Sequence, residues 1–487
     1  MQYTLMTGAT GLLGGYLLRD SLLAERPMAV IVRSSRMESA RQRIESILAR
    51  FEELQNRVLP RPVVLSGDLT QPMCGLDEPS LEWVRTHCDS MLHNAASLSY
   101  YHDEKTGEPE RSNIEGTRRV LELCQHANIT EFHHISTAYV CGLRTGTCLE
   151  SELDIGQEFG NDYERSKVEA EKMVRAADFL SCSTFYRPAI IIGDSQTGYT
   201  SSFHGFFTPL KVASALVGGA VSPELTGQRI LPALGFTLTD RKNFVPVDWV
   251  SAVVTHILQS PEHHRQTYNL VPRTPVTLAL TTQVIEDSLS RKLQNKNGAP
   301  SGPRIDLFSG LEMFREQMQV YRSYWRDDPD FDFTNTALAA PHLPCPAVDY
   351  AMLMRMAMYA LDSRFGWPQP QPIVPKHDLH DLLIVTEDQS ELTGDVVGLR
   401  ASGPGGGEWT LSVRESEVEV VAIGLPSNPL AVAYMNTLDF DLVPQERLRS
   451  GRLHFEFKDG SEHLKTMLAD SISAWIAQAL HPQEVHS

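Results

Sequence analysis

The sequence lacks the features of a secreted, membrane-inserted or zinc-bound protein. It has only seven cysteines in 487 residues, none of them in a C-x-x-C pair, so we expect reduced thiols and neither a disulfide framework nor a metal site. No apolar run reaches the roughly 18 residues that a membrane-spanning helix needs, and no signal-peptide core follows Met1. The sequence therefore predicts a cytoplasmic protein without stable membrane insertion.

A strong basic character is also missing. The chain has 43 Lys and Arg against 61 Asp and Glu, for a formal net charge of −18, and no long basic run. This charge disfavours binding to nucleic acid or to an anionic membrane, and a solvated acidic surface is its simplest interpretation. The apolar content of 42 % is ordinary for a globular protein. The length predicts roughly two to four domains.

The first half of the chain alternates strand and helix patterns. We expect strands at 3–7, 28–32, 63–65, 90–92, 132–135 and 184–192, and helices at 12–23, 36–54, 110–126 and 163–177. Apolar strands separated by helices indicate βαβ units with helices on both faces of one parallel sheet. The predicted fold class is α/β, a Rossmann-type doubly wound sheet, which places ligands at the carboxyl ends of the strands.

Later changes in pattern suggest domain boundaries. We expect a Rossmann domain at 1–193, with further strand and helix contributions up to about 255, and a smaller substrate-binding subdomain at 194–366, with helices near 206–217 and 347–362. Four prolines in residues 367–375 predict a stiff linker. Residues 376–487 then form a separate α+β module.

The carboxyl-terminal module shows strand patterns at 379–386, 396–400, 409–413, 417–423 and 453–457, and a helix pattern at 463–480. Its segments GEWTL (407–411) and SGRLHFEF (450–457) resemble sterol-carrier-type lipid-binding domains. The competing interpretation is a module for homodimerisation or for docking a carrier protein. Nothing in this part of the sequence predicts catalysis.

A glycine-rich motif, TGATGLLG, occupies residues 7–14 between the first strand and the first helix. Gly8 allows a tight turn, Gly11 lets the backbone approach a pyrophosphate, and Gly14 lets the helix pack closely on the strand. The helix amino terminus then offers N–H groups to phosphates. The predicted dinucleotide contacts in this motif are Thr7, Gly8, Thr10, Gly11, Leu12, Leu13 and Gly14.

The end of the second strand favours NADPH over NADH. NAD enzymes place a carboxylate there, whereas this chain has Arg33 in the segment IVRSSR (31–36). A guanidinium can pair with a ribose 2′-phosphate, and Arg43 is a second candidate for the same role. After the third strand, Asp68 and Leu69 are candidates for the adenine site, with an ordinary turn as the alternative for Asp68.

The candidate catalytic group is the Y-x-x-x-K pattern of Tyr163 and Lys167. Residues at i and i+4 share one face of a helix, so the phenol and the ammonium can address one site. We expect the ammonium to lower the pKa of the phenol from its usual value near ~10. Ser136 and Thr137 end a preceding strand, where a hydroxyl can hold a substrate oxygen beside Tyr163.

These motifs make the chain similar to the extended short-chain dehydrogenases/reductases, and within them to the thioester reductases, which include the terminal reductase domains of non-ribosomal peptide synthetases, carboxylic acid reductases and fatty acyl reductases. The similarity covers about residues 1–255. It is carried by HNAA (93–96), NIEGT (113–117), ISTAYV (135–140), NDYERSK (161–167), RPAI (187–190), GDSQTG (193–198) and VPVDWV (245–250). The resemblance implies a catalytic set of Thr137, Tyr163 and Lys167. It also implies a nicotinamide pocket formed by Asn94, Ala95, Ala96, Asn113, Ser136, Arg187, Pro188 and Ile190.

The implied reaction is hydride transfer from NADPH to an acyl thioester, with Thr137 and Tyr163 stabilising the oxyanion. The product is an aldehyde or an alcohol. The sequence has no adenylation domain or carrier-protein signature, so the acyl or peptidyl chain comes from coenzyme A or from a separate carrier protein. One alternative is a dehydrogenase, reductase or epimerase acting on a sterol, sugar or other small alcohol or ketone. Another is a catalytically silent cofactor-binding regulator.

Three segments are candidates for the acyl pocket, each with a structural alternative. SFHGFF (202–207) is a candidate pocket wall or a core cluster, and residues 321–333 are a cover for the channel or a docking strand. Met352, Met354, Met356 and Met358 suit an adaptable pocket, but core filling is the simpler interpretation.

Overall fold

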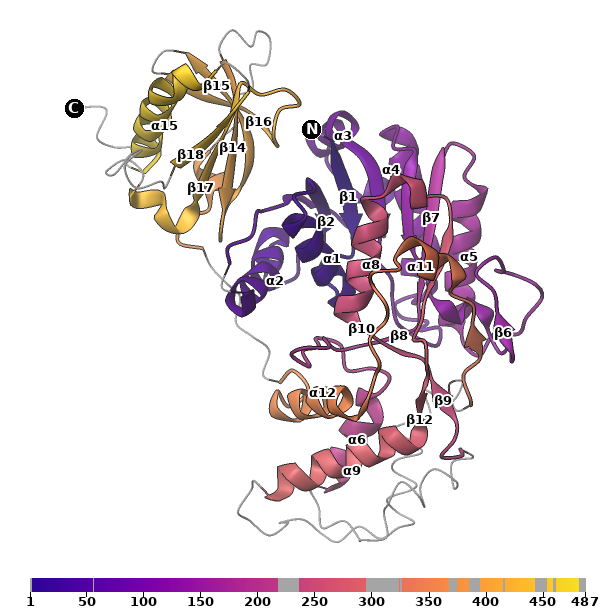
Figure 1. Cartoon of the computed structure of the whole chain (residues 1–487). Coiled ribbons are helices and arrows are strands. Elements are labelled where there is room, and N and C mark those ends of the chain that lie inside the picture. Colours follow the sequence, from indigo (N-terminus) through magenta and orange to yellow (C-terminus); the bar gives the residue numbers. More distant parts are fainter. Residues whose placement is uncertain are drawn as a thin grey trace.

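The computed structural model describes residues 2–55, 57–217, 236–294, 324, 326–367, 375–383, 385, 395–414, 417–442, 453–458 and 461–480. These residues form a large α/β body, a smaller helical part beside its sheet, and a separate carboxyl-terminal sheet with a helix against it (Figure 1). Within these ranges, no helix has both the length and the apolar character needed to cross a bilayer.

A seven-stranded parallel sheet forms the centre of the α/β body, in the order β11-β7-β5-β4-β1-β2-β3. Its strands are β1 (Tyr3–Thr7), β2 (Met28–Val32), β3 (Val63–Ser66), β4 (Cys88–His93), β5 (Glu131–Ile135), β7 (Cys182–Pro188) and β11 (Thr267–Leu270). All strands run the same way, but the order in which the chain adds them reverses between β1 and β4: β2 and β3 lie on one side of β1, and β4, β5, β7 and β11 on the other. Such a switch point is the crevice where these folds bind nucleotides. The doubly wound fold predicted from the sequence is confirmed.

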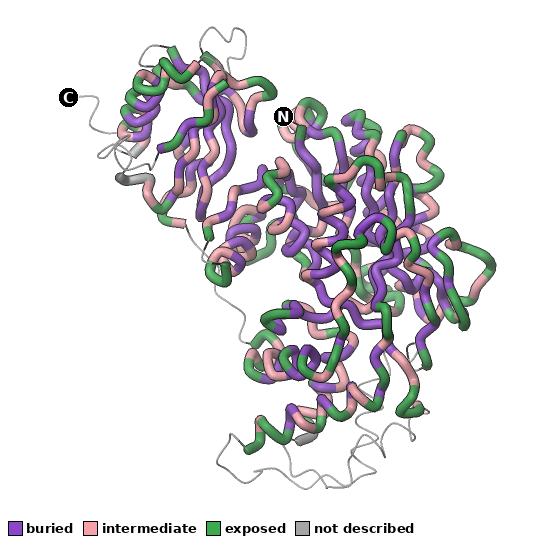
Figure 2. Tube along the Cα trace, viewed as in Figure 1, coloured by how far each residue is buried: buried purple, intermediate pink, exposed green. Residues whose placement is uncertain are grey.

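Helices cover both faces of this sheet, because alternate strand residues point to opposite faces and both sets are apolar. One face packs against α1 (Leu12–Leu23), α2 (Ala40–Gln55) and α8 (Val247–Leu258), and the other against α3 (Glu78–His87), α4 (Gly116–His126) and α5 (Asp162–Ala176). In β2, Met28, Val30 and Val32 belong to the first core, whereas Ala29 and Ile31 belong to the second. The strands are buried between these layers (Figure 2).

A smaller part packs below the carboxyl ends of the strands. It contains the helices α6 (Phe207–Val217), α9 (Leu278–Gln294) and α12 (Tyr350–Asp362), whereas α11 (Thr334–Ala339) packs against β11 and α8 of the α/β body. Its short strands pair as β8 (Ile190–Ile192) with β10 (Phe244–Pro246), β9 (Arg241–Lys242) with β12 (Val276–Thr277), and β6 (Thr147–Cys148) with β13 (Asp330–Phe331). The sequence analysis did not predict α9. Of the segment 321–333, expected as a channel cover or a docking strand, residues 321–323 and 325 lie outside the described residues. The end of this segment forms β13, which pairs with β6.

The carboxyl-terminal module is a five-stranded sheet in the order β16-β15-β14-β17-β18. Its strands are β14 (Asp395–Ser402), β15 (Gly407–Arg414), β16 (Glu417–Ile423), β17 (Ala431–Asn436) and β18 (Leu453–Phe457), and α15 (Lys465–Leu480) packs on it.

The strand expected at 379–386 is wrong, because its described start is the short helix α13 (Leu379–Leu382). The Asp378 side chain caps this helix by accepting from the His380 N–H. The sequence analysis missed β17. Residues 368–374 of the expected linker lie outside the described residues.

The module contacts the α/β body through buried polar bonds. The Tyr3 hydroxyl donates to the carboxylate of Glu408 and accepts from the Leu425 N–H at 2.9 Å. The Trp83 indole N–H donates to the Ile423 carbonyl at 2.7 Å. This interface lies on the far side of the body from the helices α6 and α9 (Figure 1).

Candidate active site

The glycine-rich segment forms a tight turn between β1 and α1. Gly8 has a φ of +73°, and a Cβ at Gly14 would lie 1.9 Å from the Gly8 carbonyl oxygen. Only glycine fits both positions, so the turn brings the first helical N–H groups to the sheet edge. Gly11 is the N-cap of α1, and no side chain caps that helix.

A cavity of about 910 Å³ starts at this turn. Among the described residues, its lining includes most of the cofactor contacts predicted from the sequence. These are Gly8, Thr10, Gly11, Leu12, Leu13, Arg33, Arg43, Asp68, Leu69, Asn94, Ala95, Ala96, Ser136, Pro188 and Ile190.

The two arginines after β2 lie at one end of the cavity. Arg33 is exposed, with its guanidinium 3.8 Å from Asp68. Arg43 is anchored, since it donates to the Thr10 hydroxyl at 3.1 Å and to the Arg33 carbonyl. Asp68 accepts from the Thr70 N–H and hydroxyl, so it also stabilises its own turn.

The three candidate catalytic residues line the same cavity. Thr137 follows β5, and Tyr163 and Lys167 project from the first turns of α5. The helix starts there because the Asn161 side chain accepts from the Glu164 N–H at 2.9 Å. The Lys167 ammonium donates to the Ile135 carbonyl at 2.7 Å, which holds α5 against the end of β5.

The pKa of Tyr163 differs from the expectation. Burial raises the pKa of Tyr163 to about 12, although a hydrogen bond with Thr137 acts to lower it. Burial also lowers the pKa of Lys167 to about 8, against the attraction of Glu171. Desolvation dominates the pKa of Tyr163, and the lowering expected from Lys167 is not found. A phenol with a high pKa is protonated at neutral pH and suits the role of a proton donor.

Four predicted contacts lie outside the described lining of the cavity. Gly14 packs under Gly8, and the Thr7 hydroxyl is buried against His93 Nδ1 at 2.7 Å. Asn113 is buried, where its amide donates to the Ser166 hydroxyl at 2.9 Å. The Arg187 guanidinium is buried in an ion pair with Glu171 at 2.6 Å. All four lie behind the wall of the cavity. Thr7 and Gly14 position the glycine turn, and Asn113 and Arg187 position the helix α5.

Two tyrosines in the cavity wall were not predicted as site residues. The ring of Tyr100 lies edge-on to Tyr163 at 6.1 Å, and Tyr324 lies edge-on to Tyr100 at 5.4 Å. Both line the cavity beside the catalytic group. Tyr324 falls in the segment proposed as a channel cover, whereas Tyr100 carried no recognisable signal, because its loop has no periodic pattern.

Beyond Tyr163 the cavity continues between α6 and α9. Phe206 lines it and also belongs, with Phe207, to the core of this part, so the segment 202–207 contributes to both the pocket wall and the core that were weighed for it. The helix α9 contributes Leu278, Thr281, Ile285 and Leu289, whose spacing of three and four residues puts them on one face. The methionines expected as pocket or core lie in the core or against it.

A nicotinamide dinucleotide fits the residues present. The glycine turn leaves backbone room, and the start of α1 has N–H groups for a pyrophosphate. The buried Ser136 hydroxyl lines the cavity and finds no partner among the described residues, so a ligand would satisfy it.

Comparisons with known proteins agree with this geometry. A family profile described as "Male sterility protein", of the NAD-binding type, matches residues 6–254. The non-ribosomal peptide synthetase asaC of Aspergillus flavus is 27 % identical over 285 residues, which cover 55 % of this chain and 26 % of that protein. The synthetase hkm10 of Aspergillus hancockii is 26 % identical over 388 residues, covering 73 % of this chain and 36 % of that protein. The chain thus spans about a third or less of the length of these two relatives.

Solved structures show the same fold. The terminal R domain from the myxalamid PKS-NRPS pathway superposes with a TM-score of 0.59 and 25 % identity, covering 76 % of this chain and 93 % of that one. The reductase domain of a non-ribosomal peptide synthetase from Mycobacterium tuberculosis gives a TM-score of 0.52 at 20 % identity, covering 75 % and 92 %.

Proposed function

Because the chain belongs to the male sterility protein family of extended short-chain dehydrogenases/reductases, we propose that it is an NADPH-dependent reductase of acyl thioesters. The product is an aldehyde or, after a second hydride transfer, an alcohol. One observation carries the proposal: Thr137, Tyr163 and Lys167 line a cavity that starts at the glycine turn and continues as an apolar channel.

The cofactor is held by residues at the carboxyl edge of the sheet. The turn at Gly8 and Gly11 receives the pyrophosphate, and Arg33 and Arg43 receive the 2′-phosphate. The high exposure of Arg33 leaves its guanidinium available for this anion, and Arg43 is held beside it. When bound, the reduced nicotinamide supplies the hydride.

The chain's own residues handle the oxygen and the proton. The Thr137 hydroxyl and the protonated phenol of Tyr163 bind the thioester oxygen, and the phenol donates its proton as negative charge develops there. Lys167 keeps a positive charge behind the phenolate that this leaves. The resulting hemithioacetal loses its C–S bond, its hydroxyl proton passes to the departing sulfur as the thiol leaves, and the aldehyde remains. Solvent then returns a proton to Tyr163.

The channel between α6 and α9 receives the acyl part of the substrate. Its walls include the apolar side chains of Phe206, Phe244, Leu278 and Ile285, which favour an aliphatic or aromatic chain over a sugar. The relatives are called non-ribosomal peptide synthetases, which supports a chain delivered by a carrier protein. Coenzyme A carries the same phosphopantetheine arm and is the alternative donor.

The proposal is tested with a panel of acyl-coenzyme A thioesters, acyl chains loaded on a carrier protein, and small ketones. Oxidation of NADPH is followed by its absorbance, and the products are identified by mass spectrometry. We expect turnover of thioesters with release of free thiol. Turnover of ketones or alcohols alone would overturn the proposal in favour of a small-molecule dehydrogenase, and dinucleotide binding without any turnover would indicate a silent regulator.

A further inference from the structure

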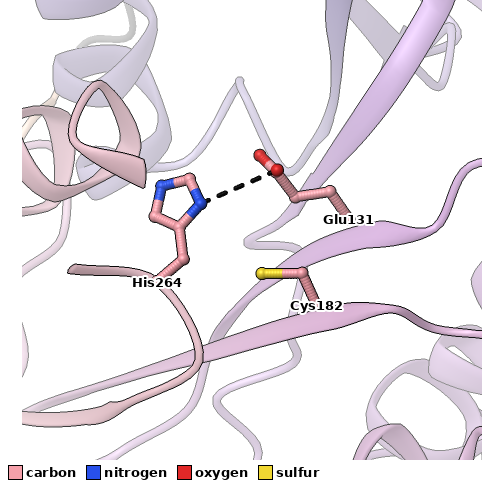
Figure 3. A group of neighbouring side chains, drawn as sticks. All are labelled: Glu131, Cys182 and His264. Carbon is pink, nitrogen blue, oxygen red and sulfur yellow. Dashed lines mark ion pairs between the residues drawn. The ribbon is translucent and has the colours of Figure 1, made fainter. Parts of the chain in front are cut away.

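Three side chains of metal-ligand type meet at the amino-terminal edge of the parallel sheet, opposite the edge that holds the cavity. Glu131 and Cys182 are the first residues of β5 and β7 and are register partners. His264 lies in the turn before β11, the neighbour of β7. The ligand atoms of these three residues lie within 4.8 Å of one another, the one such group found among the described residues, and Figure 3 shows them converging from three segments.

The hydrogen bonds of His264 determine which of its ring nitrogens faces the group. Its Nε2 lies 3.0 Å from the Ile257 carbonyl, and a carbonyl only accepts, so Nε2 carries the hydrogen. In the neutral ring, Nδ1 then presents a lone pair to the Glu131 carboxylate at 3.6 Å. The Nδ1 lone pair and the carboxylate oxygen are both acceptors, and in that state they face each other. This arrangement is stable only if a proton or a metal cation lies between the two atoms.

Glu131 is held in place from its other side. Its second oxygen accepts from His133 Nε2 at 3.1 Å, while His133 Nδ1 accepts from the Tyr186 hydroxyl at 3.0 Å. The His133 ring is fully buried between these two partners. The Ile257 carbonyl thus holds His264 in place, and the His133 imidazole holds Glu131. Metal ligands commonly have such supporting hydrogen bonds.

Cys182 is the third residue of the group, and its side chain is buried. The side chains of Thr184 and Arg265 lie beside its thiol. The nearby cation Arg26 is already bound to the Thr4 hydroxyl at 2.6 Å and the Leu258 carbonyl at 3.2 Å. A thiolate and a carboxylate together balance the charge of a divalent cation.

We propose that Glu131, Cys182 and His264 form a binding site for a borderline-soft divalent cation of the Zn²⁺ type. One sulfur, one nitrogen and one oxygen donor match the ligand preference of Zn²⁺ and disfavour Mg²⁺ and Ca²⁺. Glu131 keeps 32 % of its side chain exposed, so water can complete a tetrahedral set. Binding releases the Cys182 proton to solvent, and the metal clamps β5, β7 and the turn before β11 together.

The experiment uses the full chain after treatment with a chelator. Zn²⁺ is titrated by calorimetry, and Co²⁺ replaces it as a spectroscopic probe, since a Co²⁺–thiolate bond gives a charge-transfer band in the near ultraviolet. We expect one equivalent of Zn²⁺, this band, and a higher melting temperature with Zn²⁺. The site is separate from the proposed reductase chemistry, and none of these readouts depends on turnover.

The variants Cys182→Ser and Glu131→Gln are expected to weaken Zn²⁺ binding by about 100-fold or more, because each removes a direct ligand. Cys182→Ser should also abolish the Co²⁺ band. The matched control is Cys345→Ser, which removes a thiol outside the cluster and should change neither readout. Circular dichroism checks that each variant is folded.

Two results would overturn the proposal. The first is the absence of both stoichiometric Zn²⁺ binding and the Co²⁺ band in the unmodified chain, which would show that the three residues bind no metal. A Co²⁺ band that persists in Cys182→Ser would place the thiolate ligand elsewhere.

Discussion

The Lys167 ammonium donates a 2.7 Å hydrogen bond to the carbonyl of Ile135, the last residue of β5. Thr137 follows two residues later, and Tyr163 lies one turn before Lys167 on α5. One buried bond thus connects the helix that carries the phenol to the end of the strand that leads into the Thr137 hydroxyl. Since a misplacement of about 1 Å can cost 10²-fold in rate, this bond is part of the proposed catalytic geometry.

Replacing the phenol tests its role as an acid. Tyr163→Phe removes the proton donor and keeps the ring against Tyr100, so turnover should fall by about 100-fold or more, as for a lost general acid. Steady-state kinetics measures this loss. The affinity for NADPH, measured by fluorescence, should stay nearly constant. Unchanged turnover would remove Tyr163 from the reaction.

The pH profile should report Lys167. Its pKa is about 8, below the usual 10.5, so the ammonium is present below pH 8 and is lost as the pH rises through that value. Because the positive charge stabilises the phenolate left by proton donation, kcat should decrease above about pH 8. A Lys167→Met variant should have low activity without this decrease. A profile flat from pH 7 to 9.5 in the unmodified chain would contradict the assignment.

Cofactor choice should depend on the two arginines after β2. Arg33→Ala and Arg43→Ala each remove a charged donor to the 2′-phosphate, so each should weaken NADPH binding by roughly 10-fold. NADH binding, measured in parallel, should change little. The matched control is Arg36→Ala in the same segment, an exposed arginine outside the described lining of the cavity. Equal losses for NADPH and NADH would refute the 2′-phosphate assignment.

Two glycines of the turn should respond differently to alanine. A Cβ at Gly14 would lie 1.9 Å from the Gly8 carbonyl, whereas a Cβ at Gly11 would lie 3.5 Å from the same atom. Gly14→Ala should therefore destabilise the fold by about 1–3 kcal/mol or more. Gly11→Ala should keep the melting temperature and weaken dinucleotide binding, because Gly11 faces the cavity. Differential scanning fluorimetry with and without NADPH separates the two effects, and a folded Gly14→Ala with normal binding would contradict this account.

The interface with the carboxyl-terminal module should contribute to stability. Tyr3→Phe removes the donor to the buried carboxylate of Glu408 and the acceptor of the Leu425 N–H. The free energy of unfolding should fall by about 1–3 kcal/mol. Tyr434→Phe removes an exposed bond to Glu456 and should change it by less than about 0.5 kcal/mol. Urea denaturation measures both, and equal effects would show that the Tyr3 bond contributes little.

Local patterns were enough to predict the centre of the molecule. The motif at residues 7–14, the Y-x-x-x-K pair and the apolar strands each depend on neighbours within a few residues. Backbone sterics and side-chain periodicity act over that range, so these features follow from short stretches of sequence. The same holds for most of the predicted cofactor contacts that line the cavity, because they follow closely after strands whose carboxyl ends share one edge.

Predictions that needed distant contacts failed or were never made. β17 was never predicted, because it is paired by β14 and β18 from far along the chain. The strand expected at 379–386 failed for a local reason, since the Asp378 cap starts the helix α13 there. The high pKa of Tyr163 comes from burial, which no local pattern reports.

The sequence by itself determined the parallel sheet, the glycine turn and the spacing of Tyr163 and Lys167, because short-range geometry dictates them. Only the tertiary structure decided that Arg187 and Asn113 lie behind the wall of the cavity, that Tyr100 borders the cavity, and that the phenol of Tyr163 is buried enough for its pKa to rise. It also brought Glu131, Cys182 and His264 together. Strand register joins residues that are far apart in the chain, and burial sets their charges, so neither effect has a signature in the linear order of the residues.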